Sequence, residues 1–217
     1  MGRVTTPTLC ALVLLLLLVA APAGTAAPRR RAPAKCPPAH SRVIAADAQA
    51  QVYSTVEGEV YGCAYGTKRS YFLGLVPNCG SSGCSDVKRE VLAGPTVAYE
   101  ETSIGGVSSR ESEWRVVVRD LRTGRVLHRV PTGTPSPPNP SFVGDGFAAA
   151  IVVKSDGAVA WIVQNGVDPS EYEVQAVDKT GGRLLAASAD IDPSSLALAG
   201  SIVYWTQAGK PFSASLN

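Results

Sequence analysis

Histidine is scarce in this sequence, and its scarcity limits the chemistry available. Only two histidines occur among the 217 residues: His40 lies in a proline-rich segment and His128 in an expected strand, where we interpret it as a solvent-facing residue. Nucleophilic hydrolysis needs a serine or cysteine within hydrogen-bond reach of a base, usually histidine. A Gly-x-Ser-x-Gly motif is also absent. Both observations disfavour a serine hydrolase.

An excess of positive charge is missing as well. The chain holds 20 basic and 18 acidic residues, and residues 1–23 contain only one of these charges, Arg3. A nearly neutral chain with scattered basic residues disfavours binding to nucleic acid. The one basic cluster, residues 29–31, lies in a Pro/Ala-rich stretch and could at most tether the chain weakly to a wall or membrane surface.

The N-terminal residues are typical of an export signal. Residues 9–20 are almost entirely leucine, valine and alanine, a run too short to span a bilayer comfortably, and small residues follow it. We predict a signal peptide over residues 1–23, cut near 23–26, then a flexible tail over 24–40 and one domain over 41–217. The mature protein is expected to be secreted and not inserted in a membrane; the alternative is an uncleaved anchor.

The cysteines fit an oxidising compartment. Four would remain after cleavage, Cys36, Cys63, Cys79 and Cys84, and an even number in an exported chain predicts disulfides. The short Gly/Ser stretch before Cys84 favours a Cys79–Cys84 pair, which leaves Cys36 for Cys63. Zinc is the alternative, but C-x-x-C spacing is absent. We predict no metal and no cofactor.

Sustained helical periodicity is absent from the mature chain, whereas one phrase repeats. A turn glycine followed by an apolar strand ending in an aromatic occurs in residues 92–99, 156–161 and 198–205. Each copy precedes a longer strand, and two of these run into an Asp…Thr-Gly turn, at residues 120–124 and 178–181. Such repetition is typical of modular β architectures, so we predict an all-β fold.

The repeating unit matches a four-stranded antiparallel propeller blade. The turn glycines Gly94, Gly157 and Gly200 are 63 and 43 residues apart, and the longer interval contains the proline-rich insertion 131–140. We predict about four blades. The C-terminal unit is incomplete, and a strand over residues 42–46 could supply its missing member and close the ring; otherwise the ring is open.

Several of these segments together resemble uncharacterised secreted propeller-like proteins of high-GC Gram-positive bacteria, which are loosely similar to TolB-type and WD40-type repeats. The segments are the signal and residues 45–50, 60–63, 92–94, 116–125 and 190–196. The resemblance covers most of the mature chain and implies the fold. Its motifs are turns and strands, so it implies no catalytic residue.

Five aspartates are the candidates for acid chemistry or metal binding: Asp145, Asp156, Asp178, Asp190 and Asp192. Glycoside cleavage needs two carboxylates at a suitable separation. Asp156 and Asp178 precede glycine turns, where aspartate commonly bonds its own backbone. Asp190 and Asp192 could ligate calcium, although the rest of an EF-hand-like loop is missing.

The shared aromatics are interpreted as core and the unshared loops as binding segments. Tyr99, Trp161 and Trp205 hold a fixed place in each unit, which favours packing between sheets over ligand stacking. Residues 101–113, 132–141 and 165–170 differ between units and are better places for recognition.

We therefore predict a secreted, non-enzymatic binding or scaffold protein that recognises a protein or a cell-envelope polysaccharide through its loops. No catalytic residue is assigned. One alternative is an extracellular carbohydrate-active hydrolase or lyase that uses paired aspartates, which requires two acids at one mouth. Another is a structural subunit of an envelope assembly, self-associating through an open sheet edge.

Overall fold

A computed structural model describes residues 36–76, 84–104, 112–133, 146–165, 168 and 170–217. The expected signal and most of the 24–40 tail lie outside these residues. Every regular element of the described chain is a β-strand, which confirms the all-β class. No helix in the described ranges is long and apolar enough to cross a membrane.

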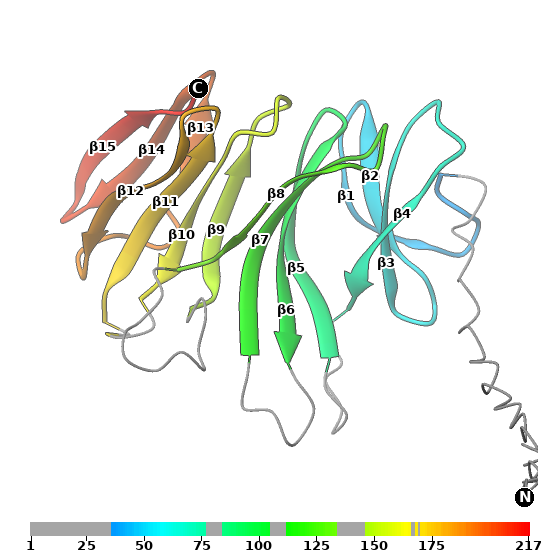
Figure 1. The fold of residues 1–217 in the computed structure, drawn as a ribbon, viewed down its shortest axis with the longest axis horizontal. Helices are drawn as coiled ribbons and strands as arrows, with labels where there is room; N and C mark the ends of the chain where they lie inside the picture. The colour runs from blue at the N-terminus through cyan, green and yellow to red at the C-terminus, as the bar shows by residue number, and fades with distance from the viewer. Residues whose placement is uncertain (1–35, 77–83, 105–111, 134–145, 166–167, 169) are drawn as a thin grey trace, which may run out of the picture. The chain divides into compact units, whose positions relative to one another are not determined.

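The strands form three sheets. Their bounds are β1 Arg42–Ala46, β2 Ala50–Ser54, β3 Glu59–Ala64, β4 Tyr71–Leu75, β5 Cys84–Ala93, β6 Thr96–Ile104, β7 Ser112–Asp120, β8 Val126–Pro131, β9 Ala148–Val153, β10 Val159–Gln164, β11 Tyr172–Asp178, β12 Gly181–Ser188, β13 Ala197–Ala199, β14 Ile202–Gln207 and β15 Lys210–Ser215. Their orders are β1 to β8, β12-β11-β10-β9 and β13-β14-β15 (Figure 1). None of these sheets closes on itself in the described part of the chain.

The eight-stranded sheet consists of two antiparallel groups of four. Strands β1–β4 pair in sequence order, and so do β5–β8. One parallel bridge, between Leu75 and Asp86, joins the two groups. The described strands therefore form four successive antiparallel groups, of which the last, β13–β15, has three strands.

The repeated glycine phrase forms the first hairpin turn of three groups. Gly94 links β5 to β6, Gly157 links β9 to β10 and Gly200 links β13 to β14, with φ of 60°, 99° and 59°. Residues with a Cβ rarely adopt this left-handed region, whereas glycine enters it freely. The recurrence of glycine thus follows from the backbone conformation that each turn requires.

The Asp…Thr-Gly phrase forms a second kind of turn, after β7 and after β11. Asp120 accepts hydrogen bonds from the Arg122 amide and the Thr123 hydroxyl, both at 2.8 Å. Asp178 Oδ1 likewise accepts from the amide and the hydroxyl of Thr180, at 2.8 and 2.6 Å. The aspartate organises the turn through its own side chain, as its place in the sequence predicts.

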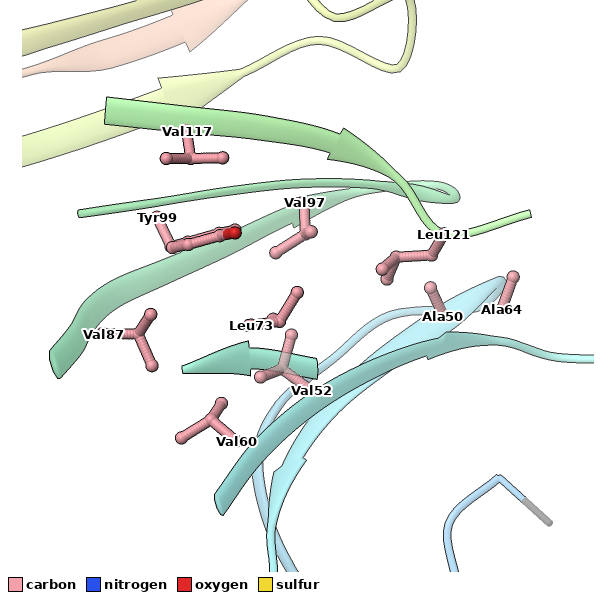
Figure 2. Close-up of a cluster of buried hydrophobic side chains, with 10 residues drawn as sticks. All are labelled: Ala50, Val52, Val60, Ala64, Leu73, Val87, Val97, Tyr99, Val117 and Leu121. Atoms are coloured by element: carbon pink, nitrogen blue, oxygen red, sulfur yellow. The ribbon is translucent and has the colours of Figure 1, made fainter. Parts of the chain in front are cut away.

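Apolar side chains hold the groups together face to face. Figure 2 shows the cluster between β2–β4 and β5–β7, to which Val52, Val60 and Leu73 contribute from one side and Val97 and Val117 from the other. Burying one such side chain contributes about 1.5–3 kcal/mol. The packing of neighbouring groups is therefore a main source of stability, in addition to the strand pairing.

Two further clusters continue this packing along the chain. One joins β6–β7 to the β9–β12 sheet, and the next joins that sheet to β14. Tyr99, Trp161 and Trp205 are only 1%, 2% and 5% exposed, and the Trp161 indole donates a hydrogen bond to the Thr132 carbonyl. The interpretation of the repeated aromatics as core is confirmed.

Residues 42–46 do not complete the C-terminal unit, which corrects one of the two arrangements expected from the sequence. They form β1, which pairs antiparallel with β2. The cause is local: Asp47 accepts hydrogen bonds from the amides of Gln49 and Ala50, at 2.7 and 2.9 Å, and so reverses the chain immediately after β1. Strand β15 keeps a free edge within the described residues.

A disulfide joins Cys36 to Cys63, with the Cα atoms 5.9 Å apart, and this confirms the expected pairing. Cys63 lies on β3, where it packs with Tyr53 and Tyr61. On the loop-entropy model a bridge of this span contributes about 3–4 kcal/mol. Cys79 and the side chain of Cys84 lie outside the described residues, so their pairing stays a prediction.

Candidate binding face at the glycine turns

Turns from all four antiparallel groups line one cavity of about 450 Å³, which we call the turn cavity. Its lining residues are Gln49 after β1, Ala93 and Gly94 at the end of β5, Val153, Lys154 and Ser155 at the end of β9, and Leu198 and Gly200 around the β13–β14 turn. Thr96 donates a hydrogen bond to the Ser155 carbonyl at 2.8 Å, which ties two of these turns together. Turns that sequence repetition relates are therefore gathered at one place.

A second cavity of about 390 Å³ shares Lys154 with the first, and we call it the aspartate cavity. Its lining residues are His128, Lys154, Asp156, Ala158, Asp178, Lys179, Ser201 and Asn217. Three of the candidates named from the sequence, His128, Asp156 and Asp178, are thus brought together. The hydrolase alternative requires two acids at one place. Whether Asp156 and Asp178 could cleave a glycosidic bond depends on the charge of each carboxyl group.

Asp178 is committed to structural bonds. Its side chain is fully buried, and Arg183 contacts both carboxylate oxygens, at 2.9 and 2.8 Å. Oδ1 also accepts the two bonds from Thr180, and Oδ2 accepts one from the Asn217 amide at 2.8 Å. The Arg183 guanidinium is the main reason that the pKa of Asp178 lies well below its usual range. Asp178 therefore stays ionised and cannot act as a general acid.

Asp156 is more exposed but is also ionised. Partial burial opposes the ionisation of Asp156. The hydrogen bond from the Ala158 amide and the charge of the Lys154 ammonium together outweigh this effect, so the pKa of Asp156 is lowered. The Lys154 Nζ atom lies 3.1 Å from Asp156 Oδ2. An acid-catalysed glycosidic cleavage needs one carboxyl group with a raised pKa. The two acids in this cavity are both shifted in the opposite direction.

His128 lines the aspartate cavity but lacks a catalytic arrangement. Burial lowers the pKa of His128 despite the nearby charge of Asp178, so the imidazole is neutral at pH 7. Ser201 lines the same cavity. Among the described residues no hydrogen bond links His128 to a serine or cysteine, although a triad-like nucleophile needs one. Its position at a cavity differs from the purely solvent-facing one expected.

Other polar groups also line the aspartate cavity. Lys154 donates to the Leu216 carbonyl at 3.0 Å and is largely covered, so it helps to fix the walls. The exposed Lys179 and Ser201 side chains have no hydrogen-bond partner among the described residues. An ammonium group, a hydroxyl and a neutral imidazole can together bind hydroxyl or carbonyl groups of a ligand.

The remaining aspartates do not join this site. Asp192 accepts hydrogen bonds from the amide and the hydroxyl of Ser194, at 2.9 and 2.7 Å, and these bonds lower its pKa. Asp190 lies in the turn just before it, and Asp145 is outside the described residues. Within the described ranges no three histidine, cysteine or acidic residues lie close enough to hold a metal ion.

Most of the unshared loops fall outside the description. Of residues 101–113, 132–141 and 165–170, only the flanking parts that extend β6, β7 and β8 and a few turn residues are described. The prediction that these loops carry recognition stays a prediction. Lys154 and Arg183 were missed as site residues because single basic residues beside a turn have no distinctive sequence pattern.

The chain matches no protein-family model and no curated protein. Two solved structures are distantly similar to it. A computationally designed protein, Ika4, is 12% identical with a TM-score of 0.43, over 84% of this chain and 96% of that one. A puromycin-hydrolysing peptidase of Mycobacterium tuberculosis is 16% identical with a TM-score of 0.43, over 80% of this chain and only 30% of its own length.

Proposed function

We propose that this chain is an exported, non-catalytic binding protein that holds a cell-envelope polysaccharide at the turn cavity and the adjoining aspartate cavity. One observation carries the proposal: the turns of all four groups line a single cavity, and the acids beside it, Asp156 and Asp178, form ion pairs and hydrogen bonds within the protein. Export is supported by the Cys36–Cys63 disulfide, since such bonds persist in oxidising compartments.

In this proposal the four groups are propeller-like units, and the turn cavity lies where their first strands meet. Support comes from the recurrence of one turn glycine in three groups and of the Asp…Thr-Gly turn in two. Contacts between neighbouring groups follow the chain order, as stacked repeats require. The three strands of the last group favour an open arrangement. The resemblance to secreted propeller-like proteins fits this proposal.

A polysaccharide suits the groups that remain free. Lys179 and Ser201 are exposed on the wall of the aspartate cavity, and Ser155 is exposed around the turn cavity; Gln49 is exposed there too, with its Oε1 bonded to Arg122 and its Nε2 available. Sugars offer many hydroxyls that such amide, hydroxyl and ammonium groups can bind. If no glycan binds, a protein is the remaining candidate ligand.

A thermal-shift series with oligosaccharides and soluble cell-wall fragments tests the proposal. A ligand at one hundred times its Kd should stabilise the oxidised protein by about 2.7 kcal/mol, or several degrees. Lys179→Ala should reduce the shift, whereas Lys210→Ala, which changes another exposed lysine, on β15, should leave it unchanged. Absence of any glycan-dependent shift would contradict the polysaccharide proposal.

A second candidate function, a structural subunit, is favoured by the free edge of β15. All but one of the residues of β15 are exposed, and Phe212 is 43% exposed. An unpaired strand edge can pair with another chain. Light scattering over a hundredfold concentration range should show reversible association if this edge is used, and a constant monomer mass would exclude it.

A further inference from the structure

A third cavity, of about 470 Å³, lies between β1 and β5, and none of its lining residues belongs to the turn face. Arg42, Val43 and Ile44 of β1 line it, together with Val87, Arg89 and Glu90 of β5. Its volume falls within the range of small-ligand sites, roughly 300–1,000 Å³. We call it the bulge cavity.

A β-bulge shapes this cavity. The register between β5 and β6 shifts between Lys88 and Val91, so Arg89 and Glu90 together oppose the single residue Tyr99. Arg89 has a φ of 57°, a left-handed conformation that is uncommon for residues with a side chain. Bulges redirect side chains and are frequent beside functional sites. Here both bulge residues line the cavity, and the Arg89 guanidinium also reaches the Ala149 carbonyl of β9.

Cationic groups in the cavity are incompletely neutralised. Arg42 has no hydrogen-bond or ion-pair partner among the described residues. The Arg89 side chain is 45% exposed; its Nη1 donates to the Ala149 carbonyl at 2.9 Å, and its Nε is 3.6 Å from Glu100 Oε2. Neither Glu100 oxygen accepts a hydrogen bond by geometric criteria. Arg89 thus has only one long contact with a carboxylate, and its Nη2 donates no hydrogen bond within the described residues, so a bidentate pair with a further carboxylate is possible.

The remaining lining includes apolar residues as well as Ser54 and a third cation, Lys88. Val43 and Ile44 are 49% and 38% exposed although both are large aliphatic residues. Val76 and Val87 add further aliphatic surface to the lining. Removing such surface from water favours binding. A ligand with a hydrocarbon portion would therefore gain more than a bare anion.

We propose that the bulge cavity binds a small carboxylate that carries an apolar chain, with the carboxylate on Arg42 and Arg89 and the chain against Val43, Ile44 and Val76. The guanidinium group matches a carboxylate in a planar, two-bond geometry. Glu90 is the one acid on the wall, and burial raises its pKa, which reduces its competition for the arginines. This site is independent of the polysaccharide proposal.

Calorimetry with hexanoate, acetate and inorganic phosphate tests the site. Hexanoate should bind at least tenfold more tightly than acetate or phosphate. Arg42→Ala should weaken hexanoate binding at least tenfold. Arg89→Gly should also weaken hexanoate binding at least tenfold. Glycine is chosen because it accepts the φ of 57° at this position, so the bulge is preserved. Arg125→Ala, which removes an exposed arginine from the β7–β8 turn, should change nothing.

Glu100→Gln gives an opposite result that a loss of folding could not mimic. Removal of the competing carboxylate should tighten hexanoate binding severalfold, because Arg89 is then free for the ligand. Equal affinity for all three probes would overturn the assigned ligand class. No hexanoate binding, or binding unaffected by both arginine changes, would overturn the site.

Discussion

Asp178 and Glu100 are both carboxylates with completely buried side chains, yet their surroundings are opposite. Asp178 receives five hydrogen bonds from Thr180, Arg183 and Asn217. Glu100 receives none that meets geometric criteria, and burial raises its pKa to about 7 despite the charges of Arg89 and Lys88 and the nearby Ala148 amide. The availability of donors, and not burial alone, decides whether a buried acid of this protein is charged.

The difference has a structural origin. The turn after β11 presents an amide and a hydroxyl to Asp178 within two residues, and Arg183 returns on the next strand. Glu100 lies mid-strand on β6, where the backbone amides are used in sheet pairing, and depends on a bulge residue for its counter-charge. A turn can solvate a carboxylate locally, whereas a strand interior cannot.

Asp178→Asn should have the largest effect on stability. The change leaves Arg183 without its ion pair and weakens the bonds to Thr180 and Asn217, so we expect a loss of about 3 kcal/mol at pH 7. Urea denaturation measures it. A loss below about 0.5 kcal/mol would mean that these bonds contribute little.

Glu100 should produce a pH-dependent effect of opposite sign. Because its pKa is raised on folding, its contribution to stability is fully present below pH 4.5 and is lost as the pH rises through about 7. Glu100→Gln should therefore be about 2 kcal/mol more stable than wild type at pH 8 and nearly equal to it at pH 4.5.

Urea titrations of both proteins at the two pH values decide this prediction. Asp178 serves as the internal contrast: its lowered pKa means that its stabilisation is present above its ordinary pKa near 4 and is lost only in more acidic solution. A Glu100→Gln variant with the same pH dependence as wild type would show that Glu100 is not the titrating group.

Two threonines sharpen the comparison at the smallest scale. Thr180→Val removes a donor to Asp178 and should cost about 1 kcal/mol. Thr102, near Glu100 on β6, is buried with a hydroxyl that has no hydrogen-bond partner. Thr102→Val should therefore be neutral or stabilising by up to about 1 kcal/mol in the same urea assay. Equal losses at both sites would contradict the account.

The parts of the fold that could be predicted from the sequence are those encoded within a few residues. Gly94, Gly157 and Gly200 each mark a turn that needs a positive φ, and the Asp178 turn follows from its own side-chain chemistry. Tyr99 could be assigned to the core because its position repeats. Local pattern and local structure coincide at these positions.

Contacts between distant segments could not be predicted in the same way. Arg89 meets Glu100 and Ala149 only because a bulge turns its side chain from β5 toward β9. Lys154 reaches both cavities because three groups pack around the turn that follows β9. Such positions depend on the register and packing of whole sheets, and no short motif in this chain predicts that register or that packing.

The most direct test of the account is a titration of the side-chain carboxyl groups by carbon-13 NMR, with assignments from Asp178→Asn and Glu100→Gln. The account predicts that Asp178 stays ionised until acid unfolds the protein, while Glu100 gains its proton near pH 7. An Asp178 that titrates at or above its ordinary pKa would contradict the account. It would return a general acid to the aspartate cavity and with it the case for a hydrolase.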